Sequence, residues 1–347
     1  MRVAIVTAQV PFLRGGAELL AEGLCKVARA AGHQAEIVTV PFKWYPAHSV
    51  AQQLLACRLL DLSESMGTRI DRVIGLKFPA YLIPHPDKML WILHQHRSAY
   101  DLWQSPYDDL ADQPGGALAR ETIRSADTQL IPEARRVYTI SRNVTDRLRR
   151  YCGIESEPLY HPPPLADRLY AGLSGDYLLM PSRMNAVKRQ HLVVEAMLRT
   201  RHPVRVVFIG EADHPDYREA LEQRAAVLPT GRVAWLGAVP DERKIALLAD
   251  CLGVLVPPHD EDYGYVTLEA MLSARPVITC TDSGGPLEFV QHGRNGLVCQ
   301  PEAEALAKAM DTLWEDRALA RAMGKEGRAL YTELGPSWER VVECLLV

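Results

Sequence analysis

The chain has 347 residues, of which 48% are hydrophobic and 24% are charged, and its formal net charge is -4 at pH 7. This length is enough for two domains of ordinary globular composition. The negative charge argues against bulk binding of nucleic acid, and no apolar run reaches the ~20 residues that a membrane span requires. Seven cysteines without a C-x-x-C pair indicate buried thiols rather than a disulfide framework or a zinc site. We therefore expect a cytoplasmic globular protein.

The first half of the chain alternates between apolar strands and amphipathic helices. Residues 2–7 form a continuous apolar run, a helical pattern begins near residue 19, and a second strand follows at 36–40. This βαβ opening predicts a parallel sheet. The loop before the helix contains Gly15 and Gly16 but no G-x-G-x-x-G fingerprint, which disfavours a dinucleotide-binding site. The two glycines serve either a tight helix entry or the close approach of a ligand.

Two further strands are predicted at 71–75 and 88–93, and the second is followed at once by His94 and, two residues later, by His96. Polar side chains at the carboxyl end of a parallel strand are typical of ligand sites. We favour His94 because it follows the strand directly, but the spacing leaves His96 open.

The remaining part of this half predicts helices and a linker. Residues 50–65 and 143–151 are expected to be helical, and the polar stretch 100–132 is expected to be helical with a break at 114–116. The helix at 143–151 is basic, so it could rest on anionic lipid, although a solvated face is the interpretation that we favour. The proline-rich stretch 161–164 is too stiff for a helix and predicts an interdomain linker.

The second half opens with a strand at 176–180, after which Arg183 and Lys188 bracket the start of a helix. A helix N-terminus attracts anions, so two cations at this position could bind a diphosphate. On residue type alone they could equally be surface cations.

The stretch 259–288 gives the strongest local signal. It follows the apolar run 251–256, which ends in two prolines and predicts a buried parallel strand leaving the sheet. Gly264 would let the backbone approach a ligand, and a helix is expected to begin near Tyr265 or Val266. A ligand is therefore expected beyond this strand, at the helix N-terminus.

Two glutamates flank that helix start. Glu261 lies in the loop and Glu269 lies inside the helix, with seven residues between them. Carboxylates accept hydrogen bonds from hydroxyl groups, while the helix end can hold a phosphate. Phosphate together with many hydroxyls describes a sugar nucleotide, although either glutamate alone would usually be a solvated surface acid.

Residues 261–298 resemble the donor-binding signature of family 4 retaining glycosyltransferases, which adopt the GT-B fold. The shared pattern contains the two glutamates at this separation, an aromatic–glycine pair between them, a Pro-Val strand, a Gly-Gly-x-x-Glu turn that ends at Glu288, and a Gly-x-x-Gly-Leu segment. Asp262 and Arg275 depart from the family pattern, and neither replaces one of the two glutamates.

This resemblance implies an α/β protein with the GT-B fold, in which two Rossmann-like parallel-sheet domains face a central cleft. We expect an acceptor-side domain at 1–163 and a donor-binding domain at 164–334. The C-terminal helix at 335–347 is expected to cross back to the first domain.

The resemblance also implies residue roles. Arg183 and Lys188 would neutralise the leaving nucleotide diphosphate, Glu261 would hold donor-sugar hydroxyls, Glu269 would hold the nucleotide ribose, and His94 would face the donor sugar. The further donor-binding residues that it implies are Tyr263, Gly264, Tyr265, Val266, Gly15, Gly16, Gly284, Gly285 and Glu288.

The activity implied by the family is transfer of a sugar, with retention at the anomeric carbon, from a UDP- or GDP-sugar to an acceptor hydroxyl. The acceptor would be a glycan or glycolipid in cell-surface polysaccharide or glycoconjugate synthesis. The nucleotide sugar is a co-substrate, so no cofactor and no metal ligand are expected. Several family members also contact the inner face of the plasma membrane as peripheral proteins.

Three alternatives remain beside this expectation. Asp260 and Asp262 form a D-x-D pattern, which holds a divalent metal on sugar diphosphates in another glycosyltransferase fold. The chain could also be a non-catalytic GT-B subunit that binds a nucleotide sugar or a partner enzyme. Sugar-nucleotide epimerases share the architecture and form the third alternative.

Overall fold

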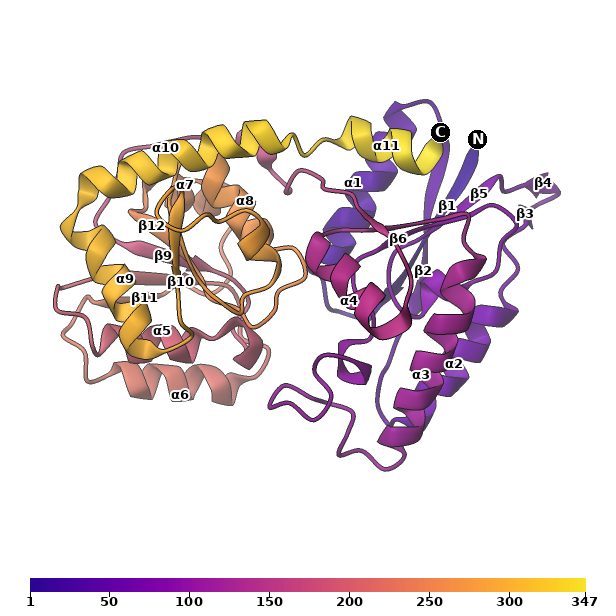
Figure 1. Cartoon of the computed structure of the whole chain (residues 1–347), viewed down its shortest axis with the longest axis horizontal. Coiled ribbons are helices and arrows are strands. Elements are labelled where there is room, and N and C mark those ends of the chain that lie inside the picture. The colour runs from indigo at the N-terminus through magenta and orange to yellow at the C-terminus, as the bar shows by residue number, and fades with distance from the viewer. The chain divides into compact units, whose positions relative to one another are not determined.

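The computed structural model describes residues 1–347 and divides them into two compact units (Figure 1). One unit contains Met1–Pro164 together with Ser337–Val347, and the other contains Leu165–Pro336. The first division falls directly after the proline-rich stretch 161–164. Each unit is an α/β structure with its own sheet.

The first unit is built around a six-stranded sheet in the order β2-β1-β5-β6-β7-β8, and every strand pair is parallel. Its strands are β1 (Arg2–Gln9), β2 (Gln34–Pro41), β5 (Arg72–Gly75), β6 (Lys88–Ile92), β7 (Arg136–Thr139) and β8 (Glu157–Pro158). A separate antiparallel hairpin pairs β3 (Glu64–Ser65) with β4 (Thr68–Arg69). Its helices are α1 (Gly16–Ala30), α2 (His48–Leu59), α3 (Gly116–Leu130), α4 (Arg142–Cys152) and α11 (Trp338–Leu346).

The C-terminal helix α11 packs against α1 within the first unit. Gly23 of α1 makes room for the Trp338 indole, because a Cβ there would lie 2.7 Å from that ring. The rings of Trp91 and His161 also contact Trp338, with centroids at 6.2 and 5.5 Å. Burial lowers the pKa of His161 to about 3, so this ring is neutral in the folded protein. The last residue before the prolines is thereby anchored to the core.

Two helix predictions in the first unit were right about the presence of a helix and wrong about its extent. The helix expected at 50–65 spans His48–Leu59, and residues 64–69 form the β3–β4 hairpin instead. Met66 and Gly67 connect the two strands with φ values of 52° and 72°, and two consecutive residues with positive φ are typical of a two-residue hairpin loop. In the polar stretch 100–132, α3 begins only at Gly116, and 100–115 consists mainly of turns.

The basic helix α4 carries fewer free cations than its sequence suggests. Arg147 is buried, and Arg149 forms ion pairs with Asp146 and Glu155, each at 3.4 Å. Arg150 lies over the ring of Tyr151 at 5.3 Å. These contacts engage some of the positively charged side chains that would otherwise attract anionic lipid.

Asp127 of α3 is fully buried and accepts three hydrogen bonds in the first unit. The donors are the hydroxyls of Tyr81 and Tyr100, at 2.9 and 2.7 Å, and the Gln95 amide at 2.9 Å. Burial disfavours the charged carboxylate and raises the pKa of Asp127 from 3.8 to about 6, although the three hydrogen bonds oppose this shift.

This raised pKa predicts a pH-dependent contribution to stability. Because the folded protein binds the Asp127 proton more tightly than the unfolded chain does, the contribution is fully present below pH 3.8 and is lost as the pH rises through about 6. The melting temperature of the wild type minus that of Asp127→Asn should therefore fall between pH 4 and pH 7. Taking the difference between the two melting temperatures cancels the contributions of the other titrating groups. A difference that stays constant between pH 4 and pH 7 would contradict the prediction.

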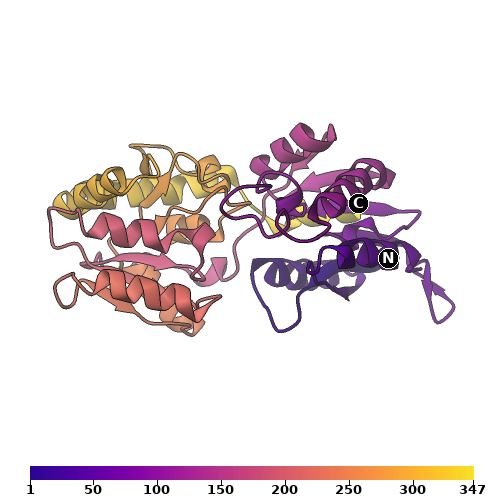
Figure 2. The ribbon, with the colours of Figure 1, turned by 90° about the horizontal axis from the view of Figure 1, so that it is seen from below.

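The second unit contains a six-stranded parallel sheet in the order β11-β10-β9-β12-β13-β14. Its strands are β9 (Leu178–Pro181), β10 (Val206–Ile209), β11 (Val233–Trp235), β12 (Gly253–Val256), β13 (Val277–Cys280) and β14 (Gly296–Cys299). Its helices are α5 (Gln190–Met197), α6 (Pro215–Ala225), α7 (Asp241–Asp250), α8 (Tyr265–Leu272), α9 (Ala303–Glu315) and α10 (Arg317–Leu334). Helices cover both faces of this sheet (Figure 2).

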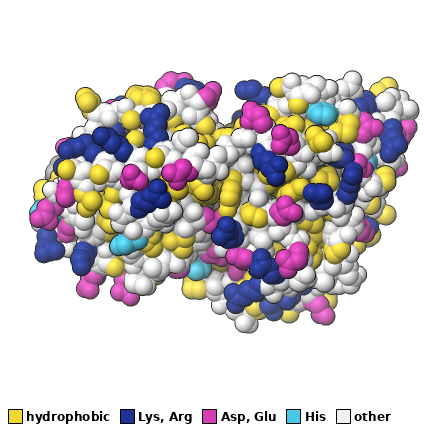
Figure 3. All heavy atoms as spheres, turned by 45° about the horizontal axis from the view of Figure 1, so that its top comes forward, with side chains coloured by type: hydrophobic (Ala, Val, Ile, Leu, Met, Phe, Trp, Pro, Cys, Tyr) yellow, Lys and Arg dark blue, Asp and Glu magenta, His cyan; other side chains and the backbone are white.

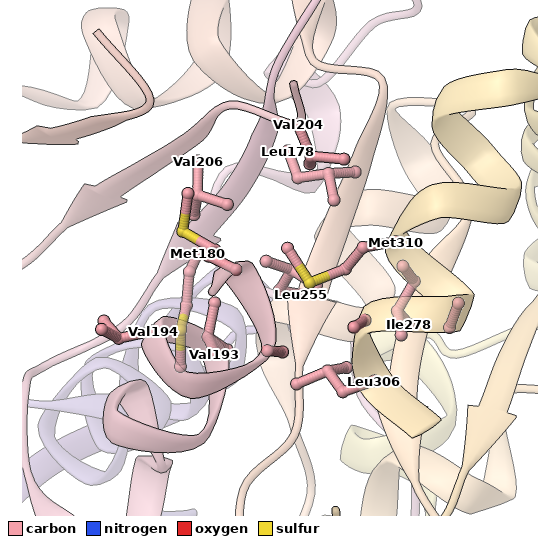
Figure 4. Packing of buried hydrophobic residues seen from close by; sticks show 14 of the residues in the cluster. Leu178, Met180, Val193, Val194, Val204, Val206, Leu255, Ile278, Leu306 and Met310 are labelled. Carbon is pink, nitrogen blue, oxygen red and sulfur yellow. The ribbon is translucent and has the colours of Figure 1, made fainter. Parts of the chain in front are cut away.

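The strand residues of the second unit alternate between two apolar clusters. Leu178, Met180 and Leu255 face one side, whereas Leu179 and Val254 face the other. Figure 4 shows the first cluster, where residues of α5 and α9 meet the strands: Val193, Val194, Leu306 and Met310. The second cluster includes residues of α7 and α8. Burial on both faces explains why the strands are apolar at nearly every position.

Basic and acidic side chains are interspersed on the face drawn in Figure 3. None of the helices combines the length and the apolar character needed to cross a membrane.

Candidate functional site

The first part of the candidate site is the loop that joins β12 to α8. Gly264 precedes the helix with a φ of 86°, a left-handed conformation that favours glycine, and a Cβ there would lie 3.0 Å from Cγ of Pro286. The helix begins at Tyr265, one of the two predicted starts. The N-terminal end of this helix, with the positive end of its dipole, therefore lies at the carboxyl edge of the sheet.

A second loop, which follows β13, is hydrogen-bonded to the first along its backbone. The N–H groups of Asp260 and Glu261 donate to the carbonyls of Asp282 and Ser283 at 2.8 and 2.9 Å, and the Gly285 N–H donates to the Glu261 carbonyl at 2.7 Å. A Cβ on Gly285 would lie 2.8 Å from two backbone carbonyl oxygens, those of residues 262 and 263. The close approach that holds the Glu261 loop therefore requires glycine at position 285.

Lys188 and Glu261 form an ion pair at this edge, through Nζ and Oε2. Lys188 ends a short helical turn after β9, which Asn185 caps by accepting a hydrogen bond from the Lys188 N–H at 3.0 Å. The Lys188 side chain is 26% exposed and the Glu261 side chain is 22% exposed, so both remain accessible to a ligand.

Arg189 is a site residue that the sequence analysis did not identify. Its guanidinium contacts both carboxylate oxygens of Asp282, at 2.8 and 2.7 Å, and His259 Nδ1 at 3.0 Å. This planar, bidentate pairing joins the loops that follow β9, β12 and β13. Burial disfavours the charged form of Asp282, but Arg189 outweighs it and lowers the pKa of that carboxyl. The only sequence signal was the adjacency of Arg189 to Lys188.

Arg183 lies near the end of β9 but contacts different partners. It is about half exposed and pairs with Asp213 at 3.2 Å, while the Asn185 amide donates to the other oxygen of Asp213 at 2.8 Å. Its guanidinium is thus held at the surface of the loop by a mostly solvated ion pair. Such pairs are weak, so a ligand phosphate could replace Asp213 at small cost.

Glu269 is 2% exposed, in contrast to an ordinary helix-surface acid. Its Oε1 accepts a hydrogen bond from Lys244 Nζ at 2.6 Å, and its Oε2 is shielded from solvent and has no hydrogen-bond partner. Burial and the neighbouring charge of Glu269 raise the pKa of Tyr265. Lys244 is a second residue that the sequence analysis did not identify.

The other candidates on this edge include both packing and half-buried positions. Tyr263 is buried, with its ring edge-on to those of Tyr265 and Phe289 at 5.6 Å in each case. Val266 packs against the apolar cluster beneath α8. Glu288 ends a helical turn that begins at Gly285 and is half-buried.

The candidates of the first unit follow β1 and β6, which are separated in the sheet by β5. The Gly15 N–H donates to Glu18 Oε2 at 2.7 Å in the N-terminal cap of α1, which begins at Gly16. The N–H of Gly15, one of the predicted donor-binding residues, is therefore already engaged in the helix cap.

The two histidines after β6 differ in their surroundings. The His96 ring packs against Phe42 and Phe78, with centroids at 6.0 and 5.6 Å, and burial lowers its pKa to about 4. Both residues are half-buried, and His94 Nδ1 lies 2.7 Å from the Gln95 carbonyl oxygen. The preference for His94 as a ligand contact stays a prediction.

The D-x-D pattern of Asp260 and Asp262 is not joined by further ligands. No group of three or more His, Cys, Asp or Glu side chains in residues 1–347 is arranged to hold a metal ion. Asp260 adopts a left-handed conformation with a φ of 44°.

Comparison with known proteins identifies the class of this chain. Residues 173–330 match the family described as glycosyl transferases group 1, which confirms the recognition from sequence motifs. A sucrose-phosphate synthase from Thermosynechococcus elongatus has a similar structure, with a TM-score of 0.78 at 17% identity over 99% of this chain and 97% of that one. The predicted GT-B fold, with two parallel-sheet domains, is confirmed.

Two further relatives are informative. The human alpha-1,3/1,6-mannosyltransferase ALG2 is 31% identical over 170 residues, which cover 45% of this chain and 41% of that protein. The match therefore spans less than half the length of that relative. The structure of Anabaena HepE in complex with UDP-glucose has a TM-score of 0.73 at 18% identity, over 99% of this chain and 98% of that one.

Proposed function

We propose that this protein is a retaining glycosyltransferase that moves a sugar from a nucleotide diphosphate sugar to an acceptor hydroxyl. The observation that carries the proposal is the accessible Lys188–Glu261 ion pair beside the N-terminus of α8. A nucleotide sugar offers a complementary group to each partner, a phosphate to the lysine and a hydroxyl to the glutamate. The family match over 173–330 supports the same activity.

In the proposed reaction, departure of the diphosphate leaves an oxocarbenium-like sugar and places negative charge on the leaving oxygen. Lys188 and Arg183 supply positive charge at that oxygen. The N-terminal end of α8 and the Gly284 N–H supply oriented dipoles, while Gly285 holds the Glu261 loop beside them. No group at this edge is an evident protein nucleophile, which suits a reaction on one face of the sugar.

The remaining candidates position the donor. Glu261 would accept hydrogen bonds from the sugar hydroxyls, and Glu269 from the ribose hydroxyls through its unpartnered Oε2. Tyr263 and Val266 would hold the loop and α8 in place, and Glu288 would fix its turn or contact the sugar. Gly15, Gly16 and His94 are proposed to contact the donor or acceptor from the first unit.

We propose a UDP- or GDP-sugar as donor and a glycan or glycolipid as acceptor. The similar mannosyltransferase and the similar structure with UDP-glucose support this class of substrate. The positive side chains proposed to face the diphosphate would take the part that a divalent metal takes in other glycosyltransferases. We therefore propose that the transfer is independent of a metal ion. We also propose that the protein acts in the cytoplasm or at the inner face of the plasma membrane.

A thermal-shift panel of nucleoside diphosphates and nucleotide sugars, with and without chelator, tests this function. A ligand at about 100 times its Kd adds roughly 2.7 kcal/mol of stability. We expect stabilisation by one nucleotide family, unchanged by chelator and greatly reduced in Lys188→Ala. No shift from any nucleotide would contradict the proposal, and a shift that chelator abolishes would favour metal binding at Asp260 and Asp262.

A further inference from the structure

An ion pair between Lys244 and the buried Glu269 joins two helices of the second unit. Lys244 is the fourth residue of α7, at the end of its first turn, and Glu269 lies in the second turn of α8, with Nζ and Oε1 2.6 Å apart. The Lys244 side chain is 26% exposed, whereas that of Glu269 is only 3% exposed. The lysine thus reaches from the edge of the unit into a nearly solvent-free position.

Stability alone does not account for this pair. Removing charges from water can cost as much as their attraction returns, and replacing a buried ion pair by apolar residues of similar volume is often neutral or stabilising. Lys244 also lies near the N-terminal end of α7, where the helix dipole disfavours a cation. A role in function, beyond stability, therefore accounts better for the Lys244–Glu269 ion pair.

The two oxygens of Glu269 are in different situations. Oε1 is occupied by Lys244, while Oε2 is shielded from solvent and lacks a hydrogen-bond donor. A buried carboxylate oxygen without a donor is costly, and a ligand donor is one way to satisfy it. Because a carboxylate only accepts hydrogen bonds, the missing partner must be a donor such as a hydroxyl group.

We infer that Lys244 is a positioning residue that fixes Oε1 of Glu269, so that Oε2 accepts a hydrogen bond from a ribose hydroxyl of the nucleotide. This inference rests on the proposed function. Lys244 thereby sets the preference of the site for ribonucleotides over deoxyribonucleotides. Without the lysine, the carboxylate can rotate about its last bond and loses the single orientation in which Oε2 meets the ribose.

The test compares the binding of paired nucleotides to the full-length protein by calorimetry. The probes are UDP, GDP and ADP together with their 2′-deoxy and 3′-deoxy counterparts. A hydrogen bond to a charged group is worth about tenfold to a hundredfold in affinity. For the nucleotide that binds most tightly, the wild-type protein should therefore bind the ribonucleotide about tenfold to a hundredfold more tightly than at least one of its two deoxy forms. In Lys244→Met, which keeps the length of the side chain without its charge, the ratio should fall to about threefold or less.

Matched variants separate positioning from mere packing. Lys244→Arg restores the cation and should recover most of the ribose preference, whereas Lys308→Met, at an exposed position of α9, should leave it unchanged. If Lys244→Met does not fold, Lys244→Gln provides the same comparison with a polar side chain. A purely structural lysine would lower the melting temperature while the ratio of ribo to deoxy affinity stayed at its wild-type value.

The outcomes distinguish this inference from the proposed function. A wild-type protein that binds nucleotides without distinguishing the deoxy forms, or a Lys244→Met variant that keeps the full ratio, overturns the role of Lys244 but leaves nucleotide binding intact. A wild-type protein that binds none of the nucleotides overturns the proposed function itself.

Discussion

Replacing Lys188 by alanine is expected to lower kcat/KM for sugar transfer by at least a hundredfold. The substitution removes a cation proposed to meet the diphosphate as negative charge develops on it, and single groups of this kind contribute about 10² to 10³ in rate. It also leaves Glu261 without its present counter-ion. Glu261→Ala should have an effect of the same order, because it removes the acceptor proposed for the sugar hydroxyls. Steady-state kinetics with the nucleotide sugar chosen by the thermal-shift panel measures both.

The fold should tolerate these changes. Lys188 and Glu261 are partly solvated, and ion pairs of this kind contribute about 0–1 kcal/mol, so the melting temperature should change by only a few degrees. Lys308→Ala, at an exposed position of α9, is the control and should retain wild-type kinetics. Near-normal turnover by a well-folded Lys188→Ala or Glu261→Ala protein would refute the assignment of the site.

The second large effect is expected on stability, from Gly324→Ala in α10. A Cβ on Gly324 would lie 2.0 Å from the carbonyl oxygen and 2.6 Å from the carbonyl carbon of Ala274, in the turn that follows α8. Backbone atoms cannot be relieved by a rotamer change, so α10 must move away from this turn. We expect a loss of about 3 kcal/mol or more, which corresponds to a fall of roughly 6–12 °C in the melting temperature of a unit of this size.

Gly327→Ala, one turn further along the same helix, is the matched control. Its Cβ would lie 3.6 Å from the nearest atoms of Asn295 and Met271, at ordinary contact distance. Alanine loses less conformational entropy than glycine in a helix, so this variant should be neutral or more stable by up to about 1 kcal/mol. Equal melting temperatures for the two variants, measured by differential scanning calorimetry, would show that the approach of α10 to Ala274 is not a constraint.

Local sequence signals were enough to predict the individual parts of the candidate site. The start of α8 at Tyr265 follows from Gly264 and from the helical spacing of the apolar residues after it. Strand ends were predicted to within a few residues because apolar runs are bounded by prolines, glycines or polar residues. The hairpin at 64–69 was missed because its two-residue strands are too short for a periodic pattern.

The meeting of these parts depends on the order of the strands in the sheet. β12 lies between β9 and β13, and all three are parallel, so the loops after them emerge side by side. This order brings Lys188 to Glu261 and Arg189 to Asp282, pairs that are 73 and 93 residues apart in the chain. In neither pair does the sequence around one residue indicate which residue will be its partner.

The sequence by itself thus determined the class of fold, the strand and helix that hold the predicted donor-binding motif, and the residue types at the candidate site, because these depend on short-range periodicity and turn chemistry. Only the tertiary structure decided which charged side chains are paired and how deeply each pair is buried. It buried Glu269 against Lys244, left the Lys188–Glu261 pair accessible, and packed His96 rather than His94 against phenylalanine rings. The physical reason is that burial and ion pairing depend on which elements pack together, and sheet topology sets that packing over long separations in sequence.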